Sequence, residues 1–224
     1  MPTPTEPLVE RAGDPAPAPK PKPKRFSMIR SFALADFITL ANAFCGMGSI
    51  LFCMAYLASG ERGAILWAFV LLPIALVCDA LDGSVARWRR KSSPLGGDLD
   101  SLADVVSFGV APAVLAFALG MRGGWDAACL AYFVACGISR LARYNATMDQ
   151  LSDESGKVSH YEGTPIPTSL GLVALLGVAF SQGRVGDELW WGSLSLGPFV
   201  LHPLVLIYVV SGSLMISTFR VPKP

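Results

Sequence analysis

Six apolar stretches, separated by short segments rich in glycine and charge, constrain this chain more than any other feature. Of its 224 residues, 52% are hydrophobic and only 16% are charged, whereas soluble domains carry about 25% charged residues. A helix needs roughly 20 apolar residues to cross a bilayer. The pattern predicts an all-α integral membrane protein with six transmembrane helices, over approximately Ala33–Ser59, Ala64–Arg87, Asp98–Leu119, Trp125–Asn145, Pro167–Ser181 and Phe199–Thr218.

The basic residues predict the orientation of these helices, because cytoplasmic loops carry most of the lysine and arginine of a membrane protein. With six crossings, fifteen basic residues fall on the side that holds both termini, and only Arg62, Arg122 and Arg184 fall on the other. We therefore expect both termini, and the loops after the second and fourth helices, to face the cytoplasm. The membrane would be the cytoplasmic membrane in a bacterium and the endoplasmic reticulum in a eukaryote.

The first 24 residues hold eight prolines and no apolar run. They predict a disordered proline-rich tail, residues 1–24, ahead of a six-helix transmembrane domain, residues 25–224. The segment Arg25–Leu34 mixes basic and apolar residues, and two interpretations stay open. It is either an amphipathic helix at the membrane interface or a simple flank of the first transmembrane helix. The net charge of +1 gives no sign of a nucleic-acid partner.

Four aspartates near the cytoplasmic ends of the second and third helices point to chemistry, because acids inside apolar helices are costly. Asp79 and Asp82 are three residues apart, and Asp100 and Asp104 are four apart, so each pair lies on one helix face. A short loop makes the two helices antiparallel and lets the pairs face each other. Four carboxylates at low dielectric repel one another unless cations compensate them. Oxygen ligands in this number suit Mg²⁺, Mn²⁺ or Ca²⁺, and one or two ions would clamp a pyrophosphate.

The neighbouring residues fit such a site. Gly83 and Gly96 remove side chains where a ligand or a neighbouring helix must come close, and Ala86 is small. Arg87 would either hold a phosphate or pair with a carboxylate. The alternative to a metal site is that the four acids are paired structural residues or belong to a proton path. Two further acids lie outside the pattern. Asp98 is expected to be solvated, and Asp36 either lines the same cavity or reaches the interface.

In order, these residues read Asp79-x2-Asp82-Gly83-x2-Ala86-Arg87-x8-Gly96-x3-Asp100-x3-Asp104. This pattern resembles, at all eight positions, the signature of the CDP-alcohol phosphatidyltransferase family. Outside the signature, further segments are similar to the phosphatidylserine synthase branch of that family: Ala35–Gly46, Asp100–Ala113, Gly137–Asn145, Tyr161–Ser169 and Met215–Pro224. The similarity covers roughly residues 30–224, and the proline-rich tail has no counterpart in it.

The resemblance implies a dimeric six-helix fold with a polar cavity open to the cytoplasm and to lipid. It implies one or two divalent ions, Mg²⁺ or Mn²⁺ with Ca²⁺ as another occupant, bound by Asp79, Asp82, Asp100 and Asp104. Asp104 would also be the general base, and the CDP group of CDP-diacylglycerol would bind at Gly83, Ala86, Arg87 and Gly96. The acceptor implied is L-serine, and the products are phosphatidylserine and CMP. We expect serine to bind at Ser139, Arg140, Arg143 and Asn145 of the fourth helix. The alternative is that Arg140 and Arg143 only enforce the topology or bind lipid phosphate.

Three other functions are compatible with parts of this pattern. The same reaction with glycerol 3-phosphate or inositol phosphate would keep the metal signature, because that signature does not encode the acceptor. A small cation transporter would distribute its acids across the membrane depth, whereas this chain places four of them at one level. A non-catalytic scaffold of the same family is disfavoured by the intact signature.

Overall fold

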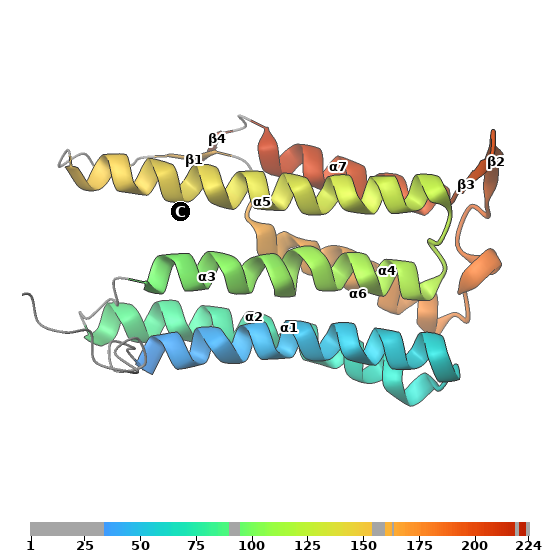
Figure 1. Ribbon diagram of the computed structural model, residues 1–224, viewed down its shortest axis with the longest axis horizontal. Helices are drawn as coiled ribbons and strands as arrows, with labels where there is room; N and C mark the ends of the chain where they lie inside the picture. Colours follow the sequence, from blue (N-terminus) through green and yellow to red (C-terminus); the bar gives the residue numbers. More distant parts are fainter. Residues whose placement is uncertain (1–33, 90–94, 154–159, 163, 218–219, 223–224) are drawn as a thin grey trace, which may run out of the picture. The chain divides into compact units, whose positions relative to one another are not determined.

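Four long helical segments contain most of the residues that the structure describes, and they run alongside one another (Figure 1). The computed structural model describes residues 34–89, 95–153, 160–162, 164–217 and 220–222, with side chains described within 34–85, 95–147 and 164–217. The first two segments are α1, Leu34–Ser59, and α2, Arg62–Arg89. The third consists of α3, Gly96–Asp104, a π-helical stretch, Val105–Val110, and α4, Ala111–Leu119. The fourth is α5, Gly124–Asp153.

These four segments are long and apolar enough to cross a membrane, over Leu34–Ser59, Arg62–Val85, Gly96–Leu119 and Gly124–Thr147. Large apolar side chains stay exposed along them, among them Phe44 of α1, Trp67 and Val77 of α2, and Ile138 of α5. A helix that is apolar all round, without being buried by protein, is typical of a membrane span. The chain is therefore an integral membrane protein, and the first four expected helices are confirmed to within a few residues.

The last two apolar helices are shorter. A 3₁₀ turn, Ile166–Ser169, leads into α6, Leu170–Ser181, and a second, Pro203–Val205, leads into α7, Leu206–Ile216. At 1.5 Å per residue, the apolar segments Ile166–Ser181 and Pro203–Ile216 are about 24 and 21 Å long. Both fall short of a hydrocarbon core about 30 Å thick. By length and hydropathy, the described residues thus form four helices that can span a membrane and two shorter apolar helices.

The expected start of the sixth helix at Phe199 is wrong. Phe199–Leu201 is strand β3, which pairs antiparallel with β2, Leu194–Leu196. The turn between the strands contains Gly197, whose φ of +65° suits glycine. The helix begins instead at Pro203, because proline lacks an N–H and is tolerated in the first turn. A second strand pair joins β1, His160–Glu162, to β4, Arg220–Pro222.

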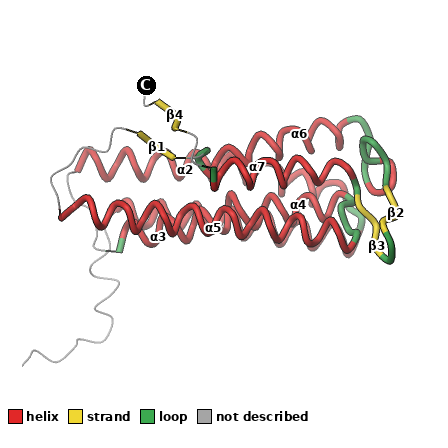
Figure 2. Tube along the Cα trace, turned by 90° about the horizontal axis from the view of Figure 1, so that it is seen from above, coloured by secondary structure: helices red, strands yellow, loops and turns green. Residues whose placement is uncertain are grey.

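The segment α3–α4 is the most buried of the four long ones: 67% of its apolar stretch lies inside the protein, against 22–33% for the others. The helices α1 and α5 both pack against it, α6 packs against α4 and α2, and α7 packs against α5. Figure 2 shows α6 and α7 alongside the longer helices, towards the end that carries β2 and β3. The opposite end carries the start of α1, the end of α2, the start of α3 and the end of α5 (Figure 1).

The crossing of α1 with the π-helical stretch is close because Gly46 has no side chain. A Cβ atom at this position would overlap Ser107, with the Ser107 Cα only 2.7 Å away. Ser107 Oγ also donates a hydrogen bond of 2.9 Å to the Asn42 carbonyl. π-Helical turns are often found at functional sites. Here the turn directly follows Asp104 and sets that residue against α1.

Candidate metal centre

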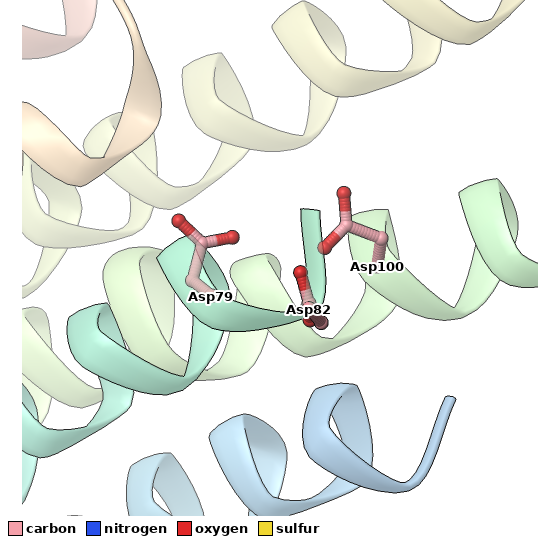
Figure 3. Close-up of side chains that lie close together, drawn as sticks. All are labelled: Asp79, Asp82 and Asp100. Carbon is pink, nitrogen blue, oxygen red and sulfur yellow. The ribbon is translucent and has the colours of Figure 1, made fainter. Parts of the chain in front are cut away.

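Three of the four predicted aspartates converge at the end of the bundle where α2 ends and α3 begins. Asp79 and Asp82 come from α2 and Asp100 from α3, as Figure 3 shows. One carboxylate oxygen from each lies within 4.8 Å of the other two. Asp82 is buried, and Asp79 and Asp100 are partly buried. The spacing of three residues on α2 and the antiparallel return of α3 produce this arrangement, as the sequence predicts.

Asp104 lies one helical turn beyond Asp100 and is 7% exposed. Asn42 Nδ2 of α1 donates a hydrogen bond of 3.3 Å to its Oδ1. The carboxylate interacts electrostatically with those of Asp79, Asp100 and Asp82. Among the described residues, the group within 4.8 Å contains the other three aspartates and not this one. Asp104 is therefore adjacent to the centre, and its role as a ligand stays a prediction.

Helix α1 supplies two partners that the sequence interpretation missed. Thr39 Oγ1 donates a hydrogen bond of 2.6 Å to Asp82 Oδ2, and Asn42 contacts Asp104. Both residues share the buried face of α1 with Asp36, which is 2% exposed. Asp36 therefore faces the bundle, and its position in the same cavity as the four aspartates stays a prediction. The signal was present in the sequence, because Asp36, Thr39 and Asn42 recur every three residues in the otherwise apolar first half of α1.

The residues of α5 predicted to bind serine separate into two groups. Arg140 is partly buried and interacts electrostatically with Asp104. Asn145 is also partly buried, and its Oδ1 accepts a hydrogen bond of 3.1 Å from Ser101 of α3. Ser139 and Arg143, by contrast, are exposed. The structure thus brings Arg140 and Asn145 towards the aspartates, and the binding of serine by any of the four stays a prediction.

The remaining predicted site residues are glycines or lie at the edge of the described part. Gly83 follows Asp82 directly in α2, and Gly96 is the first residue of α3. Ala86 and Arg87 belong to the last turns of α2, but their side chains lie outside the described residues. The tail, residues 1–24, and almost all of the predicted interfacial helix, Arg25–Leu34, lie outside them too.

Unpartnered polar atoms at this end fit a charged ligand. Asp100 Oδ1, Asn42 Oδ1 and Arg140 Nε are buried, and no described group forms a hydrogen bond with any of them. Buried polar atoms without partners are rare in native proteins and call for an explanation. A divalent cation would satisfy the carboxylate oxygen, and an anion would satisfy the guanidinium. The three converging carboxylates provide the hard oxygen ligands that Mg²⁺ or Mn²⁺ requires.

Comparison with known proteins identifies the family. Residues 32–213 match the family model described as CDP-alcohol phosphatidyltransferase. The chain belongs to this family. The family resemblance inferred from the signature is confirmed. The three aspartates that converge in this CDP-alcohol phosphatidyltransferase all belong to that signature.

Relatives from three groups of organisms bear the same name, CDP-diacylglycerol–serine O-phosphatidyltransferase. The Saccharomyces cerevisiae protein is 41% identical over 203 residues, which cover 89% of this chain and 74% of that protein. The Methanocaldococcus jannaschii protein is 30% identical, over 88% of this chain and 78% of its own length. The Mycobacterium leprae protein is 31% identical, and the match covers 84% of this chain but only 57% of that protein.

Proposed function

We propose that this CDP-alcohol phosphatidyltransferase transfers the phosphatidyl group of CDP-diacylglycerol to the hydroxyl of L-serine, which yields phosphatidylserine and CMP. The observation that carries the proposal is the convergence of Asp79, Asp82 and Asp100 beside Asp104. The name shared by the yeast, archaeal and mycobacterial relatives supports serine as the acceptor.

The carboxylates would hold divalent metal at the donor site. Asp79, Asp82 and Asp100 would bind one or two ions, Mg²⁺ or Mn²⁺, with Asp104 as a further ligand. Bound metal supplies the positive charge that offsets the pyrophosphate and the charge that develops as it is cleaved. Gly83 and Gly96 let the CDP group come close, while Ala86 and Arg87 line its site. Thr39 orients the Asp82 carboxylate by the hydrogen bond that it donates.

Asp104 is the general base. A serine hydroxyl is a weak nucleophile near neutral pH, so a base within hydrogen-bond reach is needed. The serine oxygen forms a bond to the phosphorus that carries diacylglycerol, the bond from this phosphorus to the CMP oxygen breaks, and the proton passes to Asp104. Asn42 holds Asp104 in place. Arg140, whose Nε lacks a described partner, binds the serine carboxylate or a phosphate oxygen.

The membrane arrangement that we propose has six crossings, with α6 and α7 as the fifth and sixth. Both termini and the aspartate end face the cytoplasm, because that side receives fifteen of the eighteen basic residues. The tail, residues 1–24, precedes a single catalytic domain, residues 25–224, which acts as a homodimer. Embedding in the membrane suits a donor and a product whose acyl chains both remain in lipid.

The test is CMP release by the detergent-purified protein with CDP-diacylglycerol, Mn²⁺ and each of L-serine, glycerol 3-phosphate and inositol phosphate. We expect release that depends on L-serine and is lost on chelation and restored by Mg²⁺ or Mn²⁺. Asp104→Asn should lower the rate by about 10²–10⁴-fold. Asp98→Asn, at an exposed acid of the same helix, is the matched control and should leave the rate unchanged.

Release with another alcohol instead of serine would keep the family's reaction and reject serine as the acceptor. A folded protein that releases no CMP with any of these alcohols would contradict the proposed activity. An Asp104→Asn variant with the wild-type rate would contradict the assignment of the base alone.

A further inference from the structure

A groove on the outside of the bundle, between α2 and α6, lies apart from the aspartate centre. Its walls are Leu66, Phe69 and Val70 of α2 and Val173, Ala174 and Gly177 of α6, and its volume is about 660 Å³. Small-molecule pockets have volumes of roughly 300–1,000 Å³. Leu66, Val70 and Ala174 are exposed, so the groove opens away from the protein core, towards the lipid around a membrane helix.

One cation lies at the end of this groove. Arg62, the first residue of α2, lines it with Phe180, and its guanidinium carbon is 5.2 Å from the centre of the Phe180 ring. Among the described residues, no carboxylate forms an ion pair with Arg62. The groove therefore combines an apolar channel with a positive charge that has no anionic partner in the described protein.

The position of Arg62 separates this groove from the donor site. Arg62 precedes Asp82 by 20 residues in the same helix, which corresponds to about 30 Å along the helix axis. This length equals the thickness of the hydrocarbon core. Arg62 therefore lies at the membrane interface opposite the aspartates, where the phosphates of the other leaflet are located. A lipid whose headgroup is held at Asp79, Asp82 and Asp100 cannot place that headgroup at Arg62.

We propose that the α2–α6 groove binds a phospholipid of the leaflet opposite the aspartate centre, with an acyl chain along Leu66, Val70 and Ala174 and the phosphate at Arg62. Charge complementarity favours this occupant. A guanidinium binds phosphate through paired hydrogen bonds, and the phospholipid presents its phosphate at the depth of Arg62. A second copy of the chain would cover the groove with apolar surface and leave the Arg62 charge without a counter-charge. The site stands independently of the proposed enzymatic activity.

Native mass spectrometry of the full-length protein in detergent tests the proposal, because it counts bound lipids and reports the oligomeric state together. Phosphatidylglycerol and phosphatidylcholine are titrated against the wild type, Arg62→Gln and Ala174→Phe. Arg184→Gln is the charge control, since Arg184 lines a separate cavity with Asp187 and Glu188. Ala131→Phe, at an exposed alanine of α5, is the volume control.

We expect the wild type to retain phosphatidylglycerol in preference to phosphatidylcholine. Arg62→Gln should weaken phosphatidylglycerol binding by about fivefold, and Ala174→Phe should remove the groove-bound lipid. Both controls should behave as the wild type, and an unchanged unfolding temperature will show that each variant is folded. Wild-type lipid retention by both groove variants would overturn the proposal, since the lipid would then lie elsewhere. A change of oligomeric state in Ala174→Phe without loss of lipid would assign the groove to a contact between copies instead.

Discussion

Thr39 Oγ1 of α1 donates a hydrogen bond of 2.6 Å to Asp82 Oδ2 of α2. Both residues are buried, with Thr39 4% and Asp82 5% exposed, so bulk water does not compete for this bond. Hydrogen bonds to a charged acceptor are stronger than neutral ones. Helix α1, which contributes no aspartate of the signature, thus orients a carboxylate of the candidate metal centre.

Removing this hydrogen bond should weaken metal binding. Thr39→Val keeps the shape of the side chain and deletes the donor, and loss of a supporting partner typically costs 10–100-fold in metal affinity or activity. Mn²⁺ binding, measured by electron paramagnetic resonance, should show a weakening in this range. Thr39→Ser should preserve the affinity, and so should Thr147→Val at an exposed threonine of α5. Equal Mn²⁺ affinities of Thr39→Val and the wild type would contradict a role for this bond.

The two arginines of α5 should differ in their effect on activity. Arg140 is partly buried, has an unpartnered Nε among the described residues and interacts with Asp104, whereas Arg143 is exposed. A hydrogen bond to a charged group contributes about 1.5–3 kcal/mol. Arg140→Gln should therefore lower kcat/KM for CMP release by about 10–100-fold, and Arg143→Gln should change it far less. The opposite ranking would place the substrate on the exposed face of α5.

Gly46 should tolerate no side chain. The Cβ of Gly46→Ala would overlap Ser107, including its backbone Cα, so the crossing of α1 with the π-helical stretch would have to open. Overpacking of this kind costs about 1–3 kcal/mol, which thermal unfolding in detergent should show as a lower Tm. Gly171→Ala is the matched control in α6, where nothing lies within 4 Å of the added atom. A wild-type Tm for Gly46→Ala would show that the crossing is looser than described.

A buried pair at the other end of the bundle should support stability and not catalysis. Asp126, which is fully buried, accepts hydrogen bonds from His202 N at 2.7 Å and Gly123 N at 2.9 Å. Its Oδ2 also lies 2.6 Å from His202 Nδ1. Asp126→Ala leaves these groups without their acceptor and should lower the free energy of unfolding by about 3–5 kcal/mol.

The control for this variant is Asp187→Ala, at an exposed acid near the same end. CMP release per folded molecule should stay at the wild-type value in Asp126→Ala, because Asp126 lies 14 residues, about 21 Å, from Arg140 along α5. A specific loss of turnover in the folded variant would show that this end of the bundle is coupled to the aspartate centre.

The sequence by itself determined the four long helices and placed the two aspartates of each pair on one face of their helix. Helix length and hydropathy are local properties, and a spacing of three or four residues places two side chains on one helix face whatever surrounds the helix. The short loop between α2 and α3 then allows the pairs only an antiparallel approach. These local rules, together with the eight positions of the signature, were sufficient to predict the family and the acidic centre before any contact was known.

Only the tertiary structure decided which other residues reach that centre. Thr39 and Asn42 contact Asp82 and Asp104 because Gly46 lets α1 approach the π-helical stretch closely. Their three-residue spacing indicates a polar face of α1, but it does not specify which carboxylate each side chain reaches. Arg140 and Arg143 cannot be told apart from the sequence either. The orientation of α5 in the bundle leaves Arg140 partly buried and Arg143 exposed. Distances between helices depend on how their side chains interlock, and this is a property of the packed bundle and not of any one segment.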